Sequence, residues 1–172
     1  PASGRALANR NGDAFFNQAD RNAKDTTATK VKAAKDEAAA QGKELDVYAV
    51  GVVTCRPTQK EAEEYYHYAT IENGDWSAVD GILALKNISP QTVPMQEYLV
   101  KRNQYAQGMG GLPIVGDPDF VAQQLAELSQ AGLTGIGGPL VTYADALPFL
   151  FDEVLLPLAR LGVRHTRAAP RR

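Results

Sequence analysis

Cysteine and histidine are scarce in this sequence, which limits the metal and disulfide chemistry that it can carry. Its only cysteine is Cys55, and its two histidines are His67 and His165. A disulfide within the chain would need a second cysteine, and no His, Asp and Glu spacing of the kind that binds zinc is present. We therefore expect no bound metal, and the single cysteine suits a reducing compartment such as the cytoplasm.

The sequence also lacks long apolar runs and an excess of one charge. No segment approaches the ~20 apolar residues of a membrane-spanning helix, and the first residues show no signal-peptide pattern. The net charge is −2, whereas nucleic-acid binding usually brings a strongly basic surface. We expect a cytoplasmic protein without nucleic-acid or membrane partners, and a solvated, flexible tail at residues 165–172.

Sequence motifs typical of nucleotide-binding loops and of nucleophilic catalysis are missing as well. There is no G-x-x-x-x-G-K-[ST] phosphate loop, no G-x-G-x-x-G between a strand and a helix, and no G-x-S-x-G elbow. Paired carboxylates occur only on helices that we expect to be exposed. The remaining candidate residues suit ligand binding, so we expect a cofactor to supply the chemistry. The sequence assigns no catalytic residue.

What the sequence does contain is an alternation of apolar strands and amphipathic helices. Its composition, with 44% hydrophobic and 22% charged residues over 172 positions, suits one soluble domain with a core. This order predicts an α/β fold with a parallel sheet, which is half of a (β/α)8 barrel or part of a doubly wound sheet. Strands are expected at Ala14–Phe16, Leu45–Cys55 and Leu133–Leu140, and helices at Thr26–Gln41, after Pro118 and at Ala144–Leu161.

A helical excursion at about residues 57–107 interrupts this alternation. Thr58 and Glu61 have capping-box spacing at its start, and Met95–Gln107 is its last helix. The excursion suits a lid or a dimer contact. Half a barrel would leave two parallel edges open, and folded proteins avoid open edges, so we expect the chain to be part of a larger barrel.

Two glycine-containing segments are the candidate binding elements. Ser3 and Gly4 begin a helix, where unpaired backbone N–H groups can bind an anion; alternatively, Ser3 is only an N-cap. In the stretch Gly108–Phe120, a glycine-rich turn precedes a short apolar run and a helix that Asp117 caps. Cys55 and His67 are also reactive residue types, but a buried structural thiol and a surface histidine are the simpler interpretations.

Several segments together resemble the C-terminal half of bacterial luciferase-like, flavin-dependent monooxygenases. Each motif alone is weakly specific, but their order and spacing along nearly the whole chain are typical of that family. The matching segments are Ser3–Phe16, Tyr65–Asp80, Gly108–Ala122, Leu133–Ile136, Tyr143–Phe149 and Glu153–Pro157.

The resemblance implies the C-terminal portion of a single TIM-barrel domain with a helical insertion. It implies reduced FMN as cosubstrate, delivered by a separate flavin reductase, and O2 as oxidant of a small organic substrate, in a homo-oligomer that is usually a dimer. Some members use the deazaflavin F420 instead, so an F420-dependent oxidoreductase is one alternative. A non-catalytic, flavin-binding half-barrel that dimerises is another.

The resemblance also gives site residues by position. Ser3 and Gly4 match residues that meet the FMN phosphate, and Arg5 could add charge. Some relatives that act on sulfonates carry an arginine near position 107, where a neutral glutamine cannot clamp an anion bidentately. Most residues that contact the flavin ring and substrate lie in the N-terminal half of the family, so we expect the isolated chain to be inactive. A mobile loop over the substrate matches Gln107, Gly108, Met109, Gly110 and Gly111.

Overall fold

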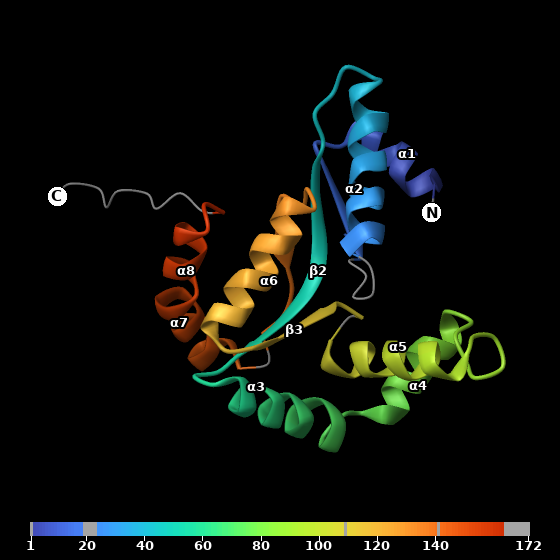
Figure 1. The fold of residues 1–172 in the computed structure, drawn as a ribbon. Coiled ribbons are helices and arrows are strands. Elements are labelled where there is room, and N and C mark those ends of the chain that lie inside the picture. The colour runs from blue at the N-terminus through green and yellow to red at the C-terminus, as the bar shows by residue number, and fades with distance from the viewer. Residues whose placement is uncertain (1, 19–23, 109, 141, 164–172) are drawn as a thin grey trace.

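The fold is a parallel four-stranded sheet with helices packed along it (Figure 1). The computed structural model describes residues 2–18, 24–108, 110–140 and 142–163. The strands are β1 (Ala14–Gln18), β2 (Asp46–Cys55), β3 (Leu112–Gly116) and β4 (Gly135–Gly137). The helices are α1 (Ala2–Asn11), α2 (Lys24–Ala39), α3 (Gln59–Tyr66), the π-helix η1 (His67–Glu72), α4 (Trp76–Leu85), α5 (Met95–Gln107), α6 (Pro118–Gln130), α7 (Tyr143–Glu153) and α8 (Leu155–Arg160).

Strand β2 is central, because the three other strands all pair with it in parallel. Its residues 46–50 pair with β1 and its residues 48–50 also pair with β4, so these two strands lie on opposite edges. Its residues 51–55 pair with β3. Within the described residues, β1 and β4 pair only with β2, so each has a second edge without a strand beside it.

The side chains of β2 alternate between two faces of the sheet. Val47, Ala49 and Cys55 are at most 3% exposed and belong to the main core, with residues of α2, α6 and α8. Helices therefore cover this face, which we call the outer face. Val50 and Val52 point to the opposite, inner face, which bears on the candidate site below.

Most of the helices and strands predicted from neighbouring residues in the sequence are present in the structure. The α/β class with a parallel sheet is confirmed, and so is the helix at Met95–Gln107. Thr58 caps α3 by accepting the N–H of Glu61, and Asp117 caps α6 by accepting the N–H of Phe120. Capping residues act over three positions of the chain, so the sequence alone displays them.

Three predictions, two about the sheet and one about the last helix, were wrong. The sequence predicted three strands, but Leu112–Gly116 forms a fourth, and the strand expected at Leu133–Leu140 is confined to Gly135–Gly137. The helix expected at Ala144–Leu161 is interrupted at Val154. Pro157 explains the interruption, because it has no N–H to donate to the carbonyl of Glu153 and its ring crowds that carbonyl.

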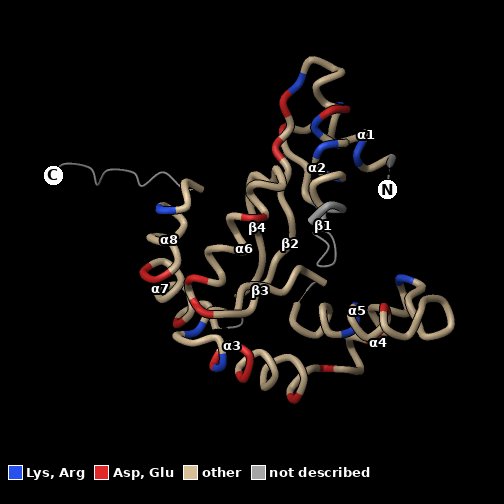
Figure 2. Tube along the Cα trace, viewed as in Figure 1, with Lys and Arg blue, Asp and Glu red and all other residues tan. Residues whose placement is uncertain are grey.

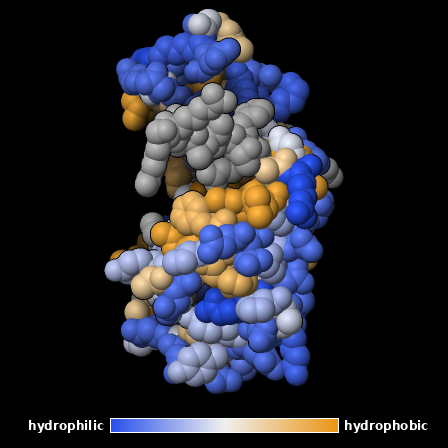
Figure 3. Space-filling model, turned by 90° about the vertical axis from the view of Figure 1, so that its left-hand side faces the viewer, coloured by the Kyte–Doolittle hydropathy of each residue, from blue (hydrophilic) through white to orange (hydrophobic). Residues whose placement is uncertain are grey.

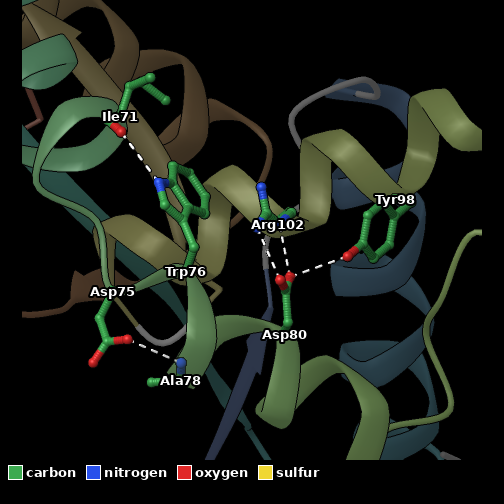
Figure 4. Close-up of polar contacts among 7 residues, drawn as sticks. All are labelled: Ile71, Asp75, Trp76, Ala78, Asp80, Tyr98 and Arg102. Atoms are coloured by element: carbon green, nitrogen blue, oxygen red, sulfur yellow. Dashed lines mark hydrogen bonds and ion pairs between the residues drawn. The ribbon is translucent and has the colours of Figure 1, made fainter.

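One polar cluster holds α4 against α5 (Figure 4). Arg102 donates from Nε and Nη2 to the Asp80 carboxylate at 2.6 and 2.8 Å, and the Tyr98 hydroxyl donates to the same carboxylate at 3.0 Å. The Arg102 guanidinium also lies 4.3 Å from the centroid of the Trp76 ring. Hydrogen bonds and an ion pair within the helical excursion thus hold together two helices that are neighbours along the chain.

The face formed by α7 and α8 is apolar on the outside. Figure 3 shows hydrophobic side chains gathered on this side of the molecule. Helix α7 has no buried residue and exposes Tyr143, Leu147 and Phe151 at successive turns, and α8 exposes Leu156 at 58%. Among the described residues, no helix combines the length and the apolar character needed to cross a bilayer.

Candidate functional site

The glycine-rich turn after α5 lies directly on the inner face of β2. A Cβ atom on Gly111 would come within 2.8 Å of a Val50 methyl and 3.2 Å of a Val52 methyl. Gly108 and Gly110 have φ angles of 135° and 69°, a region that favours glycine. The sequence thus uses glycine both to turn the chain and to bring it close to the sheet. Met109, which the sequence also assigned to this loop, lies outside the described residues.

Gln107 fixes the turn and leaves one buried atom without a partner. Its side chain is 8% exposed, and its Nε2 donates to the carbonyl of Gly111 at 2.9 Å. Its Oε1 is buried and accepts no hydrogen bond from the described residues. An unpaired buried carbonyl is costly, so this atom is a ready acceptor for a donor group brought by a ligand. The sequence placed Gln107 in the mobile loop and noted its lack of charge, but its burial could not be predicted because it depends on the fold.

The start of α1 has the features of an anion site. Ser3 and Gly4 lie in its first turn and are exposed, and no acidic residue occurs there. A Cβ on Gly4 would meet no atom within 4 Å, so the space beside Gly4 is open. Because the backbone N–H groups of a first helical turn lack partners within the helix and carry partial positive charge, the residues present fit a phosphate group.

Arg5 faces away from such a role, toward α2. Its Nε and Nη2 donate to the two carboxylate oxygens of Glu37, each at 2.9 Å, and Asn9 donates to the same carboxylate at 3.1 Å. This pair fastens α1 to α2. Sequence reasoning did not find it, because Arg5 and Glu37 come from different helices.

The structure places the two candidate segments on separate elements. Ser3 and Gly4 belong to α1, which packs beside α2, whereas the Gly108–Gly111 turn lies against β2 at the far end of α5 (Figure 1). Any ligand that touches both must therefore extend from the edge of the sheet to its inner face.

The other reactive side chains behave as structural groups. His67 is exposed, with its Nδ1 3.0 Å from a carboxylate oxygen of Glu72. Cys55 is buried in the main core. The pKa of the Cys55 thiol is raised to about 11; burial is the main cause, the charge of Asp117 adds to the rise, and Arg56 partly opposes it. Within the described residues, no group of three or more His, Cys, Asp or Glu side chains could hold a metal ion.

The raised pKa of Cys55 predicts an unreactive thiol. Since the thiolate is the nucleophile, alkylation of the folded chain by iodoacetamide at pH 8 should be more than about tenfold slower than that of a free thiol. The rate should rise as pH approaches 11 and should reach the free-thiol value in denaturant. Rapid labelling of the folded chain at pH 8 would contradict both the burial and the direction of the shift.

A parallel sheet whose helices cover one face, with its inner face carrying a glycine-rich turn, is the arrangement of a partial (β/α)8 barrel. The chain belongs to the family described as luciferase-like monooxygenase, whose model matches residues 2–135. The fold class and the family resemblance inferred from the sequence are thereby confirmed. A comparison with curated proteins by sequence gave no match.

Solved structures share this fold at low sequence identity. EDTA monooxygenase from Chelativorans sp. BNC1 superposes with a TM-score of 0.70 at 23% identity, over 95% of this chain and 43% of its own. A riboflavin lyase with modified FMN gives 0.67 at 20% identity, over 96% and 42%. The F420-dependent tetrahydromethanopterin reductase from Methanopyrus kandleri gives 0.56 at 18% identity, over 88% and 47%. The chain thus spans less than half the length of each of these proteins.

Proposed function

We propose that this chain is part of a flavin-dependent monooxygenase that takes reduced FMN from a separate flavin reductase and oxidises a small organic substrate with O2. When bound, reduced FMN would supply the electrons that activate O2 for transfer of one oxygen atom to the substrate. Family membership supports the reaction class. The proposal of FMN as cofactor rests on the first turn of α1, which contains Ser3 and Gly4 and no acidic residue.

The residues of this chain would hold and enclose the ligand. The Ser3 hydroxyl and the backbone at Gly4 would bind the phosphate, while Arg5 stays with Glu37. The Gly108–Gly111 turn would close over the inner face and exclude water. The free Oε1 of Gln107 would accept a hydrogen bond from flavin or substrate. Because Gln107 is neutral, this position gives no bidentate clamp for an anionic substrate such as a sulfonate.

Replacing Ser3 tests the phosphate site. Ser3→Ala should weaken FMN binding by about 1–2 kcal/mol, the scale of a hydrogen bond to a charged group, without changing helix content. Flavin fluorescence titration of the 172-residue chain measures the effect. Riboflavin, which has no phosphate, should bind wild type and variant alike. Ser129→Ala, at an exposed position of α6, is the matched control. An FMN dissociation constant that does not respond to Ser3→Ala would remove Ser3 from the site.

The same titration, repeated with F420, distinguishes an F420-dependent enzyme from an FMN-dependent one. A superposition with an F420-dependent reductase supports this second candidate, which would make the chain part of an oxidoreductase without oxygen transfer. Tighter binding of F420 than of FMN would favour it. We propose FMN, because the similar structures include a monooxygenase and a riboflavin lyase with modified FMN.

A third candidate is a non-catalytic, flavin-binding half-barrel that dimerises. The exposed apolar residues of α7 and α8, and the second edges of β1 and β4, favour it over a stable monomer. Sedimentation analysis with and without FMN distinguishes the cases. A stable dimer of the 172-residue chain that binds FMN would support this candidate, whereas a chain that stays monomeric with and without FMN would contradict it.

A further inference from the structure

Arg56 differs from the other half-buried arginines of the described chain. Arg5 is paired with Glu37, and Arg102 is paired with Asp80, each through two nitrogen atoms. Arg56 is also half-buried, yet within the described residues no carboxylate lies within ion-pair distance of it. A half-buried guanidinium without a counter-ion can pair with an anion that approaches it, so Arg56 is available to an anionic ligand.

The guanidinium of Arg56 is nevertheless held in one place. It lies 3.8 Å from the centroid of the Tyr65 ring, and its Nη1 donates to the carbonyl of Cys55 at 2.8 Å. A guanidinium has five N–H donors, and the described residues provide no further acceptor for it. Stacking on an aromatic ring and one backbone bond pre-organise the remaining donors for an incoming group.

A pocket opens beside these donors at the carboxyl end of β2. Its volume is about 360 Å³, and its walls include Pro57, Ala146 and Phe149 as well as Arg56 and Tyr65. The apolar walls come from α3 and α7, so the pocket can take an aromatic or aliphatic body. Its opening lies where parallel α/β folds commonly bind ligands, beyond the carboxyl ends of strands.

The charges around the pocket define what it can accept. Asp145 lines the same pocket but forms no ion pair with Arg56. Asp117 and Glu153 line a neighbouring pocket of about 390 Å³, at the corner where Figure 2 shows acidic segments of α6 and α7 together. Among the residues that line the pocket itself, Arg56 is the cation and Asp145 is the acidic group; Arg160 lines the neighbouring pocket together with Asp117 and Glu153.

The pocket and the glycine-rich turn belong to opposite faces of β2. Gly111 approaches Val50 and Val52, whereas Cys55, which lines the pocket, belongs to the alternate set of side chains that meets the outer helices. None of residues 3–5, 107, 108, 110 and 111 lines this pocket, so a ligand can be seated here without touching the residues of the proposed flavin site. Its binding can be measured without flavin or turnover.

We propose that this pocket binds a small organic carboxylate, with Arg56 as the receptor of the acid group and Tyr65 and Phe149 flanking its apolar body. The planar fork of arginine donors matches the two oxygens of a carboxylate. Nothing in this assignment requires a reaction, so it describes a binding site that is separate from the question of oxygen transfer.

Phenylacetate and its neutral analogue phenylacetamide test the proposal on the 172-residue chain. Isothermal titration calorimetry should show saturable binding of phenylacetate and at least about tenfold weaker binding of the amide, because the amide cannot form the charged pair. Arg56→Gln should weaken phenylacetate binding by a similar factor. Arg10→Gln, at an exposed position of α1, should leave it unchanged. Asp145→Asn should strengthen binding, since it removes a like charge from the pocket.

Three outcomes would overturn the carboxylate site. They are the absence of saturable binding to the folded wild-type chain, equal affinity for acid and amide, and undiminished binding to Arg56→Gln. If Arg56→Gln does not fold, the comparison of acid and amide on the wild-type chain still decides, together with the NMR shift of the Arg56 Nε–H signal on titration. A shift with phenylacetate and none with phenylacetamide supports the proposal, and no shift with either contradicts it.

Discussion

Replacing Gly138 with alanine should abolish the attachment of β4 to the sheet. A Cβ at this position would overlap the carbonyl oxygen of Gly51, in the middle of β2. Both groups are backbone, so no side chain can rotate to relieve the overlap, and the chain after β4 must move away. We expect the free energy of unfolding to fall by more than about 3 kcal/mol, above the usual range for overpacking, as measured by urea denaturation followed by circular dichroism.

Gly81→Ala is the matched control for this prediction. Gly81 lies within α4, and a Cβ there would meet no atom within 4 Å. Alanine should therefore stabilise the chain by about 0.5–1 kcal/mol through helix propensity. If Gly138→Ala unfolds at the same urea concentration as wild type, the close approach of Gly138 and Gly51 does not exist in solution.

Neutralising Asp80 should loosen the helical excursion by roughly 2 kcal/mol at pH 7. Asp80→Asn keeps the shape of the side chain but loses the charge that receives three hydrogen bonds from Arg102 and Tyr98. Bonds to charged groups contribute more than neutral ones, and the 45% exposure of the Asp80 side chain reduces the effect through solvent screening. Urea denaturation of the two proteins at pH 7 measures the difference.

The same pair of proteins has a characteristic pH dependence. Hydrogen bonds from Arg102 are the main cause that lowers the pKa of Asp80 below its usual 3.8. A carboxyl group whose pKa is lower in the folded state stabilises that state above the unfolded pKa and loses this contribution as pH falls through the folded pKa. The stability gap between wild type and Asp80→Asn should be constant from pH 7 to about pH 5 and should close below pH 3.8. A gap that persists unchanged at pH 2 would show that the charge of Asp80 is not its source.

The parts of the fold that the sequence predicted are those set by neighbouring residues. Thr58 and Asp117 indicate the starts of two helices, because each side chain accepts a hydrogen bond from the backbone N–H three residues later. The run from Asp46 to Cys55 is β-branched and apolar enough to be recognised as a buried strand. Helix Met95–Gln107 lies between Pro94 and Gly108, which bound it clearly.

The parts that it missed depend on distant residues. Leu112–Gly116 contains a proline and follows two glycines, so its composition suggests a loop; it becomes a strand because residues 51–55 offer it a pairing edge. At the candidate site, the sequence found Ser3, Gly4 and the glycine-rich turn through local composition. It could not show that Glu37 engages Arg5, that Gln107 is buried with a free carbonyl, or that Arg56 lies on Tyr65.

The central position of β2 has a consequence for how the chain acquires its structure during synthesis. Residues 14–18, which cover one edge of β2, are made before it, but the partners of its other pairings are residues 112–116 and 135–137. While residues 59–107 are being made, their helices can fasten to one another through nearby contacts such as Asp80 with Arg102. Non-local pairing of this kind is the slow step in folding, and unpaired strand edges promote aggregation. The valine-rich strand β2 therefore keeps backbone groups unpaired until residues 112–116 and 135–137 have been made, and during this interval it is exposed to aggregation.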